Sequence, residues 1–179
     1  MNRTPSPNLK RGSVLWLTTT ALFTAMNVIL SMSVFSIPVP GGHLYFCDAV
    51  INTAAILLDP LAAFIVGGVG SFLGDFFFYP APMFVSLVTH GLQAAAVSYL
   101  SRRLLRNRPV LGSGLAVTAG SLIMVIGYTL GRAYVYSTPE YAVLKLPFEV
   151  LQAAFGAAVS MFLLYSMRLR TAFARMLAR

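Results

Sequence analysis

Charged residues are scarce in this sequence. Only 10% of its 179 residues are Asp, Glu, Lys or Arg, whereas 58% are hydrophobic and the mean hydropathy is +0.77. This balance excludes an ordinary soluble domain and is typical of a membrane protein that crosses the bilayer several times. The single cysteine, Cys47, excludes a disulfide framework and a cysteine-based metal cluster within the chain. We therefore expect no redox chemistry, no metal and no cofactor.

Motifs for ATP binding and catalysis are also missing. The motif G-x-x-x-x-G-K-[ST] occurs nowhere, so the chain cannot bind ATP by that device. The two histidines do not form H-E-x-x-H, and neither G-x-S-x-G nor a paired acidic motif is present. These absences argue against an intramembrane enzyme, which remains one alternative to a transport protein. A membrane assembly subunit without transport activity is the other alternative.

Apolar runs, in contrast, follow one another along the chain and are separated by short loops. They cover about residues 13–36, 46–58, 61–79, 82–101, 109–131 and 146–167. The second run is too short for the roughly 20 residues that cross a bilayer, so we expect it to be tilted, kinked or shielded by its neighbours. The pattern predicts an all-α membrane protein, a six-transmembrane-helix bundle that forms a single domain over residues 1–179. The first run continues past the roughly 7–15 residues of a signal peptide's apolar region and lacks a clear cleavage site, so we expect it to be retained.

Basic residues indicate the orientation of this bundle. Most of them lie before the first run, between the fourth and fifth runs, and after the sixth. With six spans these segments share one side, which the positive-inside rule assigns to the cytoplasm. Residues 1–12 and the basic tail 168–179 are thus both predicted to be cytoplasmic, in a prokaryotic plasma membrane. The net charge of +8 is explained by orientation and anionic lipid headgroups rather than by nucleic-acid binding.

Polar side chains recur at helical spacing near the predicted outer ends of the last three runs, and the first outer loop adds aromatic groups. The candidate substrate-binding residues are Tyr45, Phe46, His90, Gln93, Tyr128, Arg132, Lys145, Glu149 and Gln152. An ion pair between Lys145 and Glu149, four residues apart, would explain two of them. More polar groups converge than such pairing needs, so we predict a ligand site open to the outside.

Small residues predict close helix packing. Residues 67–74 contain overlapping small-xxx-small patterns, and Ala21 and Ala25 form another in the first run. For the glycines we favour packing within the chain over packing with a partner. Asp48 and Asp75, near the outer ends of the second and third runs, are expected to have structural roles such as capping of backbone amides.

Three stretches carry a resemblance to a known family: ALFTAMNVIL, FCDAVINTAAILLDPLAAFIVGGVGSFLGDFF and LPFEVLQAAFGAAV. In this order, they resemble the S component, the substrate-binding membrane subunit, of an energy-coupling factor (ECF) transporter. The resemblance implies that Ala21 and Ala25 match an AxxxA motif that docks onto a membrane-embedded T component. It further implies that two cytoplasmic ATPases hydrolyse ATP for this complex. The substrate would lie near the outer surface, among the fourth to sixth helices and the first outer loop.

The substrate itself is less defined by the sequence. Glu149 and Gln152 suit a ligand with adjacent N–H or O–H donors, and Phe46 and the tyrosines suit a planar ring. Pyridoxine-like rings, pyrimidines and deazaguanines such as queuosine or queuine fit, and riboflavin, folate or another vitamin stays open. We favour a deazaguanine, whose N1 and N2 donors match a bidentate carboxylate. The prediction is a high-affinity substrate-binding subunit of an ECF-type ABC importer for a water-soluble micronutrient.

Overall fold

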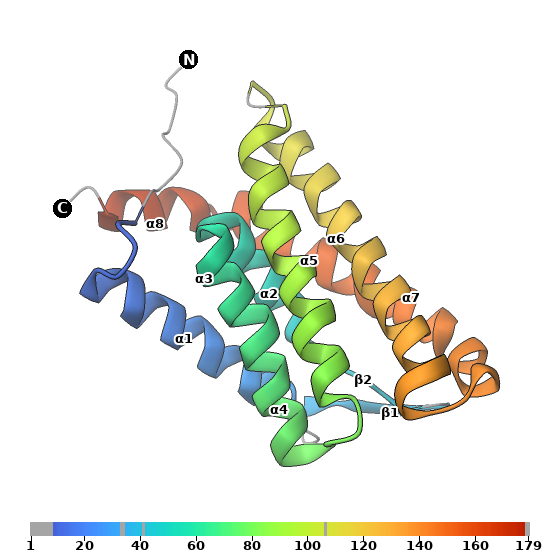
Figure 1. Ribbon diagram of the computed structural model, residues 1–179. Coiled ribbons are helices and arrows are strands. Elements are labelled where there is room, and N and C mark those ends of the chain that lie inside the picture. Colours follow the sequence, from blue (N-terminus) through green and yellow to red (C-terminus); the bar gives the residue numbers. More distant parts are fainter. Residues whose placement is uncertain (1–8, 33–34, 41, 106, 178–179) are drawn as a thin grey trace.

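The computed structural model describes residues 9–32, 35–40, 42–105 and 107–177, most of which are helical (Figure 1). The elements are α1 (Val14–Leu30), β1 (Ile37–Val39), β2 (Gly42–Leu44), α2 (Cys47–Leu57), α3 (Pro60–Phe64), η2 (Ile65–Val69), α4 (Gly70–Phe78), α5 (Met83–Arg103), α6 (Pro109–Gly131), η3 (Arg132–Tyr136), α7 (Pro139–Met161), η4 (Phe162–Ser166) and α8 (Leu169–Leu177). The η elements are π-helical turns that continue the helices beside them. The prediction of an all-α membrane protein is confirmed.

Four helical rods are long and apolar enough to cross a membrane. They are Pro60–Phe78, Met83–Arg103, Pro109–Tyr136 and Pro139–Ser166. The apolar helices α1 and α2 are shorter, with 17 and 11 residues. Every residue of α2 is buried, so neighbouring helices shield this short helix. All six predicted apolar runs form helices, but the count of six complete spans stays a prediction.

The start of one helix and the conformation of one loop differ from the sequence-based expectation. The sixth run begins at Pro139 rather than at residue 146, because Thr138 caps the helix and proline suits its first turn. The loop between α1 and α2 contains a short antiparallel hairpin, in which Val39 pairs with Gly42. Gly42 adopts a φ of 146°, a backbone conformation that glycine accommodates.

Helix packing explains the small residues of the third run. A Cβ at Gly67 would lie 2.5 Å from the carbonyl oxygen of His90 in α5, and one at Gly70 would lie 2.6 Å from the side chain of Asn27 in α1. These backbones approach closely only because no side chain intervenes. The prediction that the glycines pack within the chain is confirmed.

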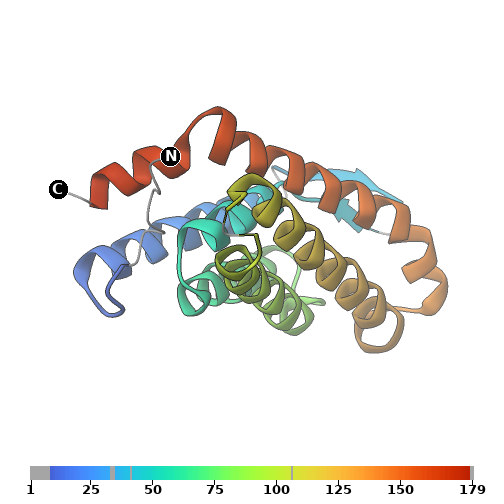
Figure 2. The ribbon, with the colours of Figure 1, turned by 90° about the horizontal axis from the view of Figure 1, so that it is seen from above.

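The two ends of the bundle differ. In Figure 1, α8 and the turn between α5 and α6 lie toward the upper end, and the hairpin and the turn between α4 and α5 lie toward the lower end. Seen from above, α7, η4 and α8 run along one side of the molecule, with the hairpin beside α7 (Figure 2). The basic connections therefore lie away from the hairpin and from the polar groups around it.

Candidate substrate-binding pocket

A pocket opens beside the hairpin, between α4, α5, η3 and α7. It holds about 530 Å³ of space, counted up to its open mouth. The residues around it are Ser31, Gly42, His43, Tyr45, Cys47, Ser71, Asp75, Tyr79, Pro82, His90, Tyr128, Arg132, Tyr136, Glu149 and Gln152. The mixture of aromatic walls with a few polar groups is typical of small-molecule sites.

Most of the sequence-predicted residues meet at this pocket. Tyr45, His90, Tyr128, Arg132, Glu149 and Gln152 line it. The structure places the other three differently. Phe46 packs edge-on against Phe155, with ring centroids 5.4 Å apart, and Gln93 lies behind His90. Lys145 is buried, and its Nζ donates to the carbonyl oxygen of His43 over 2.6 Å.

A buried ion pair forms one wall of the pocket. Arg132 Nη2 donates to Glu149 Oε1 over 2.9 Å, and the guanidinium also lies over the ring of Tyr136, 5.3 Å from its centroid. The carboxylate of Glu149 thus has Arg132 as its hydrogen-bonded partner, whereas the alternative explanation from the sequence paired it with Lys145. The π-helical turn η3 extends the face of Tyr128 and Arg132 by one turn and brings Tyr136 to the same pocket.

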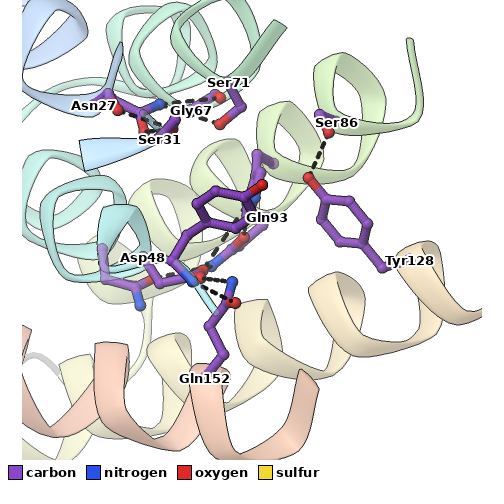
Figure 3. A network of polar contacts seen from close by, with 12 residues as sticks. Asn27, Ser31, Asp48, Gly67, Ser71, Ser86, Gln93, Tyr128 and Gln152 are labelled. Atoms are coloured by element: carbon purple, nitrogen blue, oxygen red, sulfur yellow. Dashed lines mark hydrogen bonds and ion pairs between the residues drawn. The ribbon is translucent and has the colours of Figure 1, made fainter. Parts of the chain in front are cut away.

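Asp48 connects three helices behind the pocket (Figure 3). Its Oδ1 accepts from Gln93 Nε2 of α5 over 3.0 Å, and its Oδ2 accepts from Gln152 Nε2 of α7 over 2.7 Å. Gly156 permits this arrangement, because a Cβ there would overlap the Cβ of Asp48. We expected a structural role for Asp48, such as capping of backbone amides, and in the structure it holds two side-chain amides.

Asp75 ends a chain of hydroxyl groups on the other side of the pocket. Tyr128 donates to Ser86 Oγ over 2.5 Å (Figure 3), and Ser86 donates to the carboxylate of Asp75. Asp75 also lines the pocket, and its carboxylate accepts from a side-chain hydroxyl, whereas we had named capping of backbone amides as one structural role for it. Asp48 and Asp75 are carboxylates within apolar runs, and that signal could have placed them among the candidate site residues.

The loop between β2 and α2 closes the pocket near Tyr45. The backbone N–H of Tyr45 donates to Gln152 Oε1 over 3.0 Å, which ties this loop to α7. Burial and the nearby carboxylate of Asp75 raise the pKa of the Tyr45 phenol, so this hydroxyl stays neutral and able to donate at physiological pH.

One group of side chains has the composition of a metal site. Ligand atoms of Cys47, Asp48 and His90 lie within 4.8 Å of one another, and all three residues are buried. Both carboxylate oxygens of Asp48 accept amide hydrogens in this arrangement. The group is therefore organised as a hydrogen-bonded network, with the Cys47 thiol at the pocket wall.

An apolar helix bundle with a small-molecule pocket at one end defines a substrate-binding membrane protein. Residues 12–169 match the model of the family described as "ECF-type riboflavin transporter, S component", and this chain belongs to that family. A Pyrococcus woesei protein, described as an uncharacterized protein in the gap 3' region, is 32% identical over 135 residues, which cover 75% of this chain and 88% of the relative.

The family membership confirms the resemblance that the sequence carries. S components are transporter subunits that bind a small-molecule substrate and assemble with an ECF module, and they are not enzymes. The membership also supports a multi-pass location in the membrane, in agreement with the four long apolar helices.

Proposed function

We propose that this S component binds riboflavin in the pocket beside the hairpin and delivers it to an ECF module. The observation that carries the proposal is the pocket, which combines four tyrosines with a buried Arg132–Glu149 pair. The description of the family, which names riboflavin, supports the same substrate.

The chemistry of the pocket suits a flavin. The isoalloxazine ring is planar and can stack on tyrosine rings. Its imide N–H and the hydroxyls of its ribityl chain are donors for the carboxylates of Glu149 and Asp75. Its carbonyl oxygens are acceptors for the guanidinium of Arg132. Each polar feature of the ligand thus has a complementary side chain at the pocket wall.

A deazaguanine such as queuine is the second candidate. It was favoured because a free carboxylate at Glu149 could accept from two adjacent N–H donors. In the structure Glu149 Oε1 already accepts from Arg132, so a ligand donor at this oxygen would share it with the guanidinium. Riboflavin ranks first because the description of the family names it.

Titration of the purified protein in detergent tests the substrate. We expect riboflavin to bind with release of heat and to lose fluorescence as its ring stacks on the tyrosines, whereas queuine and pyridoxine should bind more weakly. Mass spectrometry of the molecule that co-purifies from cells provides an independent identification. Absence of riboflavin binding, together with tight binding of queuine, would reverse the ranking.

We assign partner docking to the exposed surface of α1 that carries Ala21 and Ala25. Ala21 and Ala25 are exposed, one helical turn apart, and can admit close approach of a membrane helix. We place the pocket end outside the cell and the basic end in the cytoplasm, where two ATPases of the module would act through the T component. Both termini are then cytoplasmic, as the positive-inside rule suggests.

A further inference from the structure

Asp48 determines the direction of the hydrogen bonds around it. It is 1% exposed, and its two oxygens face the amide nitrogens of Gln93 and Gln152. A carboxylate can only accept, so both glutamine side chains must turn their NH₂ groups toward Asp48. Their carbonyl oxygens therefore point away from it and act as acceptors.

This orientation fixes the tautomer of His90. Gln93 Oε1 lies 2.7 Å from His90 Nδ1 and has no hydrogen to donate. Nδ1 must therefore carry the proton, and in a neutral ring Nε2 is then left with a lone pair. His90 lies at the pocket wall, where a lone pair on Nε2 can accept a hydrogen bond from a ligand.

On the other side of the pocket, a carboxylate also sets which groups in the hydroxyl chain donate and which accept. Because Asp75 accepts from Ser86 and Ser86 accepts from Tyr128, the Tyr128 hydrogen is already used inside the protein. Its phenolic oxygen can still accept. Two independent carboxylates thus turn side chains at the pocket wall into acceptors.

We infer that Asp48 is a positioning residue that sets the hydrogen-bond polarity of the pocket, by holding His90 as the Nδ1–H tautomer with Nε2 ready to accept from a ligand N–H or O–H group. The assignment of the ligand rests on the proposed function, whereas the tautomer does not. The inferred specificity is for ligands that present donors to this wall.

Nitrogen-15 NMR of histidine-labelled protein in detergent tests the tautomer without any ligand. The chain has two histidines, so a His43→Asn variant assigns the signals of His90. We expect a protonated Nδ1 and an unprotonated Nε2. An Nε2–H tautomer or a doubly protonated ring in the otherwise unchanged protein would overturn the inference.

Two variants test whether Asp48 and Gln93 cause this state. Asp48→Asn leaves only one oxygen to accept from the two glutamines. Gln93→Met removes the acceptor for Nδ1–H. We expect Nε2 to become protonated in a substantial fraction of either variant. Asp59→Asn, at the other end of α2, is the matched control and should leave His90 unchanged. An unaltered tautomer in both test variants would exclude the positioning role, and if one variant does not fold the other still decides.

Ligand analogues test the specificity. Riboflavin is compared with its N3-methyl derivative and with lumiflavin, which lacks the ribityl hydroxyls. We expect at least one analogue to bind the unchanged protein about 10-fold more weakly, and this difference to shrink in Gln93→Met. A difference that is the same in both proteins would refute the acceptor role of His90. Failure of riboflavin itself to bind would refute the proposed substrate and leave the tautomer result standing.

Discussion

The side chains of Arg132 and Glu149 are only 9% and 5% exposed, and they form a hydrogen-bonded ion pair at the pocket wall. Because both charges are buried, each compensates the other, and removal of one leaves the other without its partner. The same two groups line the pocket, where a ligand can contact them. Stability and affinity therefore depend on one pair, and substitutions must be chosen to separate the two effects.

Glu149→Gln should lower both properties. We expect a loss of about 3–5 kcal/mol in stability because Arg132 stays buried without its counter-charge. Riboflavin affinity should fall about 10- to 150-fold with the loss of a charge-assisted contact. Glu140→Gln, the same change at an exposed site on the same helix, should alter neither. Thermal unfolding and calorimetric titration measure the two effects.

The double variant Glu149→Gln with Arg132→Met separates them further. Removal of both charges should restore much of the stability, while the affinity should stay low. If the affinity of Glu149→Gln equals that of the unchanged protein, Glu149 does not belong to the binding site.

Asp59 provides a pH-dependent contact at the end of the molecule away from the pocket. Burial would raise the pKa of this carboxyl, but hydrogen bonds from the Trp16 indole and the Leu61 N–H, together with the charge of Arg11, outweigh burial and hold the pKa below its ordinary value of 3.8. A carboxyl with a lowered pKa stabilises the fold above its unfolded-state pKa, and this contribution is lost as the pH falls through the folded-state pKa.

The thermal unfolding midpoint should therefore decrease in acid partly through Asp59. Measured in detergent from about pH 6 to about pH 3, this decrease should be smaller in Asp59→Asn, which has no carboxyl to protonate. Identical pH profiles for the two proteins would show that the contacts of Asp59 do not contribute to acid sensitivity.

At the scale of elements, the buried side chain of Asn27 links α1 to the rod Pro60–Phe78. Asn27 Nδ2 donates to the carbonyl oxygen of Val66 over 2.7 Å and lies 3.2 Å from Ser71 Oγ (Figure 3). Val66 belongs to the π-helical turn η2, where an extra residue per turn disturbs the usual pairing of backbone carbonyls. Asn27 thus satisfies a carbonyl of the irregular turn and joins two helices.

Asn27→Leu should destabilise the protein by about 1–3 kcal/mol, because a buried carbonyl loses its donor while the side-chain volume is nearly kept. Thr18→Ala is a suitable control, since the exposed Thr18 hydroxyl bonds only within its own helix. Thermal unfolding of both variants gives the comparison. Equal midpoints would mean that Asn27 is not a significant link.

The sequence predicts the helices better than it predicts the contacts between them. Apolar runs predict the helices because lipid requires backbone groups to be satisfied within each segment. The start of α7 at Pro139 was missed, since polar and aromatic residues interrupt the apolar pattern there. Spacing on one helix predicted that Gln152 and Glu149 share a face, but the partners Asp48 and Arg132 come from other helices. Such partners depend on helix packing, which periodicity does not encode.

At the scale of the whole molecule, the proposed binding and docking surfaces are separate. The pocket lies among α4, α5, η3 and α7, whereas Ala21 and Ala25 are exposed on α1. A protein built this way can hold its substrate before and after it joins a partner. Variants on one surface should therefore leave the function of the other largely intact.

Ala21→Trp or Ala25→Trp should block assembly with the T component and abolish uptake, because the large ring prevents close helix approach. Riboflavin affinity of the isolated chain should stay nearly the same. Leu115→Trp, at an exposed site on α6, should preserve uptake. Co-purification with the ECF module, cellular uptake and titration provide the three measurements. Parallel loss of affinity and uptake would contradict the separation of surfaces.

The burial of α2 has a consequence for the biogenesis of the protein. With 11 residues, among them Asp48 and Asn52, this helix is too short and too polar to partition into lipid alone when it leaves the ribosome. It can reach its final place only when α5 and α7 have been synthesised and enclose it. A chain truncated after residue 58 and released from the ribosome should therefore leave Cys47 of α2 accessible to a water-soluble thiol reagent. In the complete chain, where Cys47 is 3% exposed, the reaction should be much slower.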